Sequence, residues 1–179
     1  MENKNLDKLL LRTAFSCMAC DGDIDNREIV LIKKIHQDNK IFGEIDINEE
    51  LEALLSDINR DGKRFLLNFF NDLSANDLNE QEELKLIKVA IDTIKADEKV
   101  EYSEIKFFKV IRSKLKIKNE TILAVYPDFE QYLEQDIISE TYLRKLLDDF
   151  FDGNIIPQFD FLKPINTDLS DLLDENENV

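Results

Sequence analysis

The sequence predicts an all-α protein, a compact helical bundle of about seven to nine helices that contains two repeated helix–loop–helix units. Apolar residues recur at spacings of three and four along almost the whole chain, which is the period of an amphipathic helix. Only 4 Gly and 3 Pro interrupt 179 residues. No segment alternates between apolar and polar residues with the period of a strand. Helices packed on helices are therefore expected.

The first half of the chain has the pattern of four helices. The first carries its apolar stripe over residues 6–20 and ends near Asp21. A second begins at Asp25 or Asn26. A third opens at Asn48, and the Asp61–Gly62 pair separates it from a fourth, which is rich in Phe and Leu up to residue 73.

The second half begins with the longest expected helix, residues 77–96. The next starts at Glu101 or Ser103, and a short one over 120–126 stops before Pro127, because a residue preceding proline disfavours the helical conformation. One or two helical turns follow over 129–133. Ser139 is a suitable N-cap for a last helix that Gly153 ends.

The chain divides into a helical domain, residues 1–153, and an acidic, partly extended tail, residues 154–179. Pro157 and Pro164 flank an extended stretch in that tail. Its side chains Phe159, Phe161 and Leu162 could dock on the body of the protein, the simpler interpretation, or on a partner.

Acidic residues dominate the charge of the chain. Asp and Glu number 39 against 23 Lys and Arg, which gives a net charge of −16. Residues 121–179 alone hold 14 acids and 3 bases. Such a field repels nucleic acid and attracts cations and basic partner surfaces. We expect no direct nucleic-acid binding.

Membrane and export signals are not recognisable. The first residues lack the apolar core of a signal peptide. No apolar run approaches the roughly 18 residues of a membrane-spanning helix. A cytoplasmic protein without a transmembrane segment is expected; the sequence does not indicate its oligomeric state.

A carboxylate motif occurs twice at a constant offset. Asp21, Asp25 and Glu28 are matched by Asp97, Glu101 and Glu104, and the differences 97−21, 101−25 and 104−28 all equal 76. Each copy lies between two expected helices. If the two helix pairs face each other across a pseudo-two-fold axis, all six carboxylates could lie near one another.

Two interpretations of these carboxylates remain open. Hard divalent cations take several oxygen ligands, which such a cluster supplies. Alternatively, the acids cap helices: Asp25 and Glu28 have the spacing of a capping box, whereas Glu101 is a poor N-cap. An EF-hand is excluded, because Asn26 stands where that loop needs glycine and Ile32 where it needs glutamate.

The chain resembles the TerB-like (tellurite-resistance) family, which includes the N-terminal part of the DjlA co-chaperones. Two motifs carry this resemblance: Asp21-Gly22-Asp23-Ile24-Asp25-x-x-Glu28 and Asp97-x-x-Val100-Glu101-x-x-Glu104. The resemblance spans residues 6–117. It implies a compact helical fold, a metal-binding role for the acidic residues, and a place in stress or tellurite-resistance systems near the membrane. Glu98 departs from the glycine usual in that pattern.

Other constellations have simpler explanations. Cys17 and Cys20 have a redox or half-zinc spacing, but they fall on an apolar stripe and fit helix packing, since a zinc site needs four ligands. His36, the single histidine, is expected on a solvated face. No nucleophile, base and oxyanion-hole set is recognisable, so an enzyme is not expected.

The resulting prediction is a non-enzymatic protein that binds a divalent metal ion or a basic partner through Asp21, Asp25, Glu28, Asp97, Glu101 and Glu104. Two alternatives stay open. The acidic C-terminal third could act as an adaptor that recruits a protein partner, or the chain could be an acidic mimic of nucleic acid.

Overall fold

The fold is all-α, as the sequence predicts. A computed structural model of the chain describes residues 4–21, 26–96 and 102–133, and this part contains helices and no strand. Its elements are α1 (Lys4–Met18), η1 (Ala19–Asp21), α2 (Asn26–Asn39), α3 (Ile47–Arg60), α4 (Gly62–Ala75), α5 (Glu80–Ile94), α6 (Tyr102–Lys114), α7 (Asn119–Val125), η2 (Pro127–Phe129) and α8 (Glu130–Leu133). The expected helix after Ser139 and the tail 154–179 lie outside the described residues.

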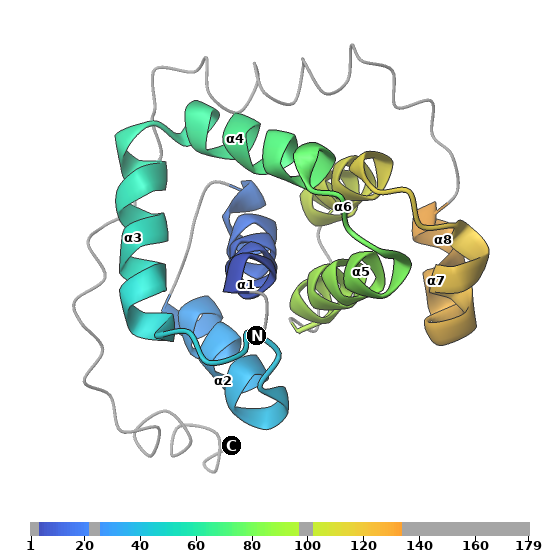
Figure 1. Cartoon of the computed structure of the whole chain (residues 1–179), viewed down its shortest axis with the longest axis horizontal. Helices are drawn as coiled ribbons and strands as arrows, with labels where there is room; N and C mark the ends of the chain where they lie inside the picture. The colour runs from blue at the N-terminus through green and yellow to red at the C-terminus, as the bar shows by residue number, and fades with distance from the viewer. Residues whose placement is uncertain (1–3, 22–25, 97–101, 134–179) are drawn as a thin grey trace, which may run out of the picture.

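Helices α1 and α5 form the centre of the bundle and make its most extensive contact. Helices α3 and α4 meet at a corner and frame α1 (Figure 1), and both contact it. Helix α6 packs on α1, α4 and α5, while α7 contacts α5 and α8 contacts α6. Helix α1 is thus enclosed by other elements, which explains why Leu10, Ala14 and Phe15 are at most 1% exposed.

The internal repeat is a repeat of helices as well as of sequence. Shifted by 76 positions, the bounds of α1, 4–18, become those of α5, 80–94, and the start of α2 at 26 becomes the start of α6 at 102. Helices α3 and α4 lie in the chain between the two copies. The two central helices are therefore equivalent positions of one repeated unit.

Aromatic side chains fill the space between α4 and α6. The rings of Phe69 and Phe107 stack with centroids 6.3 Å apart, and Phe70 lies 5.4 Å from Phe107. Phe108 meets Phe129 of η2 edge-on at 5.1 Å. Core packing is thus the role of these rings, as their helical spacing predicts.

The junctions between helices depend on polar caps that move several expected boundaries. Asp46 accepts hydrogen bonds from the backbone N–H groups of Asn48 and Glu49, so α3 starts at Ile47 rather than Asn48. Asn79 and Glu82 form a reciprocal capping box, and α5 therefore starts at Glu80, not at residue 77. It ends at Ile94 rather than residue 96.

Asp61 joins α3 to α4 without an intervening loop. Its backbone N–H donates to the carbonyl of Asp57 in α3, and its carboxylate accepts from the backbone N–H of Arg64 in α4. The break expected at Asp61–Gly62 is confirmed. No helix in the described ranges has the length and apolarity needed to cross a membrane.

Candidate functional site

Three of the six predicted carboxylate residues belong to the described part of the chain. Asp21 is the last residue of η1, Glu28 lies in the first turn of α2, and Glu104 lies in the first turn of α6. Asp25, Asp97 and Glu101 lie outside the described residues.

Helix α6, which carries Glu104 of the second copy, lies against η1, which ends at Asp21 of the first copy. Helix α6 contacts both η1 and α1. Burial raises the pKa of the Cys17 thiol, and the nearby negative charge of Glu104 raises it further. Glu104 therefore lies within electrostatic range of the last turn of α1, which leads directly into the first acidic loop.

This contact orients the two repeat units. The loop after α5 leads into α6, and the first turn of α6 lies beside the end of α1. The end of α1 and the start of α6 therefore lie beside each other. We call the region where the first turn of α6, with Glu104, meets the end of α1 the acidic end.

The described side chains at the acidic end are partly buried. Glu28 and Glu104 are both half-buried, and each interacts with other groups of the protein. They occupy the third position of their helices, which fits the capping interpretation as well as ligation. Residues 4–21, 26–96 and 102–133 contain no group of three His, Cys, Asp or Glu side chains arranged to hold a metal ion.

The two cysteines belong to the core beside this end. Cys17 and Cys20 are 1% and 3% exposed, and neither forms a disulfide. Because burial raises the pKa of Cys17, its thiol stays protonated at neutral pH and is a poor nucleophile and metal ligand. Their packing role agrees with the sequence prediction.

The expectation that His36 lies on a solvated face is wrong. Its ring is half-buried and stacks on Phe42 with centroids 5.8 Å apart, and its Nδ1 atom is buried without a partner among the described residues. Burial lowers the pKa of this histidine. The sequence missed this pairing because Phe42 lies beyond the end of α2, outside any helical period.

Comparisons of the chain with family models, with characterised proteins and with solved structures find no match. The functional proposal therefore rests on the geometry of the acidic end and not on similarity to known proteins.

Proposed function

We propose that the chain is a non-enzymatic, TerB-like protein that binds a divalent cation or a basic partner at the acidic end, in a cytoplasmic stress response of the tellurite-resistance type. The observation that supports this most directly is the position of Glu104 beside the end of α1. This position supports the proposal because a carboxylate of the second copy lies beside the helix end that leads into the first copy.

Electrostatic repulsion favours a cationic ligand at the acidic end. Bringing carboxylates of two loops to one end of a chain with net charge −16 costs electrostatic free energy, because like charges repel. A divalent cation, coordinated by several carboxylate oxygens, would remove that cost and gain ligand bonds. A basic protein surface would offset the same repulsion without fixed coordination geometry.

Calorimetric titration with Ca²⁺, Mg²⁺, Mn²⁺ and Zn²⁺ tests the metal-binding form of the proposal. Wild-type protein should bind at least one of these ions, and both Asp21→Asn/Asp97→Asn and Glu28→Gln/Glu104→Gln should weaken that binding by about tenfold or more. The matched control is Glu49→Gln/Glu52→Gln, which removes the same charge from two exposed side chains of α3. Equal binding by all four proteins would contradict it.

A basic peptide, oligo-lysine, tests the partner form. Surface electrostatic attraction weakens as added salt shortens the Debye length, whereas a coordinated metal is screened much less. Two results together would support a basic partner. Peptide binding should decline steeply between low and physiological salt, and Glu28→Gln/Glu104→Gln should reduce it more than the α3 control does. If neither metal nor peptide responds to these substitutions, the acids act as helix caps and the proposal fails.

A further inference from the structure

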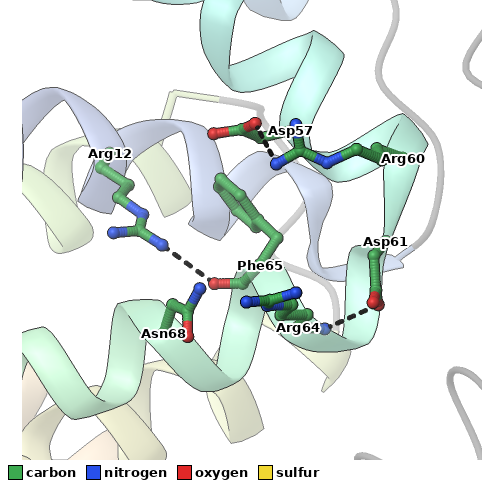
Figure 2. Close-up of a pocket in the computed structure, with 7 residues that line it drawn as sticks. All are labelled: Arg12, Asp57, Arg60, Asp61, Arg64, Phe65 and Asn68. Atoms are coloured by element: carbon green, nitrogen blue, oxygen red, sulfur yellow. Dashed lines mark hydrogen bonds and ion pairs between the residues drawn. The ribbon is translucent and has the colours of Figure 1, made fainter.

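A pocket at the corner of α3 and α4 gathers three arginines. It is a hollow of about 210 Å³ lined by Arg12, Asp57, Arg60, Asp61, Arg64, Phe65 and Asn68. Figure 2 shows the guanidinium groups of the three arginines around the Phe65 side chain, with Asp61 at the edge beside the start of α4. Three guanidinium groups in one small hollow contrast with the acidity of the chain as a whole.

Arg12 is fixed as one wall of this pocket. Its Nη1 donates to Asp72 at 2.6 Å and its Nη2 to the Phe65 carbonyl at 3.0 Å. The guanidinium carbon also lies 4.9 Å from the centre of the Phe65 ring, a cation–π distance. Its Nε is buried without a hydrogen-bond partner among the described residues. One donor of this rigidly held side chain thus lacks an acceptor.

The two carboxylates of the pocket are already engaged. Asp57 accepts from Arg60 at 2.8 Å, and Asp61 accepts from the backbone N–H of Arg64 at 3.0 Å. Within the described ranges, the guanidinium of Arg64 has no carboxylate partner. Three arginines against two aspartates give the seven lining residues a charge of +1, and Asp72, outside the lining, offsets the charge of Arg12.

The size of the hollow restricts what can bind. Pockets for metabolites and drug-sized ligands occupy about 300–1,000 Å³, so 210 Å³ suits a single small group. The planar guanidinium group presents paired N–H donors that match two oxygens of a carboxylate or a phosphate. We propose that this arginine pocket is an oxyanion site, which takes one phosphate or carboxylate group between Arg12, Arg60 and Arg64.

Two sources could supply the oxyanion: a free phosphate group, or a carboxylate from the acidic stretch 165–179 of the same chain. That stretch holds five acids and no base. The pocket is lined by residues of α1, α3 and α4 and by Asp61, and it shares no residue with the proposed carboxylate site. Its test is therefore independent of the function proposed above.

Isothermal titration of the full chain with inorganic phosphate, at constant ionic strength, tests the site. Arg64→Gln should weaken phosphate binding by about tenfold, the effect of removing a charged hydrogen-bond partner. Lys34→Gln removes the same charge from an exposed position on α2 and should change the affinity by less than about twofold. Measurable phosphate binding that is equal in Arg64→Gln and wild type would overturn the proposal.

A second full-length variant separates the two sources. It replaces Asp168, Asp171 and Asp174 with Asn, and Glu175 and Glu177 with Gln. If carboxylates of this stretch fill the pocket, the variant binds phosphate more tightly than wild type, and adding Arg64→Gln abolishes the gain. If phosphate is the occupant, both proteins bind it alike. If neither protein binds phosphate, or if the gain persists with Arg64→Gln, the pocket is not an oxyanion site.

Discussion

Replacing Glu83 with Ala should destabilise the protein by about 2 kcal/mol. This carboxylate of α5 is only 4% exposed, and it accepts a hydrogen bond at 3.0 Å from the backbone N–H of Lys116, 33 residues away. A hydrogen bond to a charged group contributes about 1.5–3 kcal/mol. Because Lys116 itself is exposed, water can replace part of the lost bond, which favours the lower half of that range.

Arg112 adds a second reason for a loss of stability. Burial lowers the pKa of its guanidinium, and the negative charge of Glu83 opposes that shift. Without Glu83 the buried cation is less well compensated. Glu83→Gln keeps an acceptor for Lys116 but removes this charge, so it should retain about half of the stability that Glu83→Ala loses.

Urea denaturation followed by circular dichroism measures both variants. A loss of 2 kcal/mol corresponds to a fall in melting temperature of about 4–8 °C for a chain of this size. Glu52→Ala is the control, because Glu52 is exposed on α3 and its loss should cost less than about 0.5 kcal/mol. A Glu83→Ala protein within 0.5 kcal/mol of wild type would refute the reasoning.

Three further substitutions or treatments test other parts of the fold. Gly43 has φ of +63° and a Cβ there would overlap the Asp7 carboxylate, so Gly43→Ala should cost about 1–3 kcal/mol in urea denaturation. Burial lowers the pKa of His36 from its usual 6.5, so the unfolded chain takes up this proton at a higher pH than the folded chain does. The free energy of unfolding should therefore fall as the pH drops through 6.5, and it should fall less steeply in His36→Gln. Cys17 and Cys20 should resist a thiol reagent in the native protein and react only in urea; rapid native labelling would contradict their burial.

The fold class and the repeat could be predicted because both are local patterns. A helical period needs only neighbouring residues, and the offset of 76 is visible without structure. Helix starts were harder, because the caps Asp46 and Asn79 compete with other polar residues nearby. The choice between Asp46 and Asn48 depends on which side chain meets the free N–H groups.

The arginine pocket had no sequence signal. Arg12 reaches Phe65 and Asp72, which are 53 and 60 positions away. Such contacts depend on how α4 crosses α1, and no spacing along the chain encodes that crossing. The carboxylate motif, by contrast, was visible because its members are close in sequence; its metal-binding role stays a prediction.

The two copies of the repeat carry basic side chains with different ion-pair partners at one equivalent position. Arg12 becomes Lys88 after a shift of 76, and Lys88 pairs with Asp92 on its own helix at 2.6 Å. Arg12 instead reaches across to α4, a helix that stands between the copies in the chain. The pair α3–α4 thus breaks the symmetry of the duplication and creates the arginine pocket on one half only. The proposed anion site and the proposed cation site can consequently be gained or lost separately.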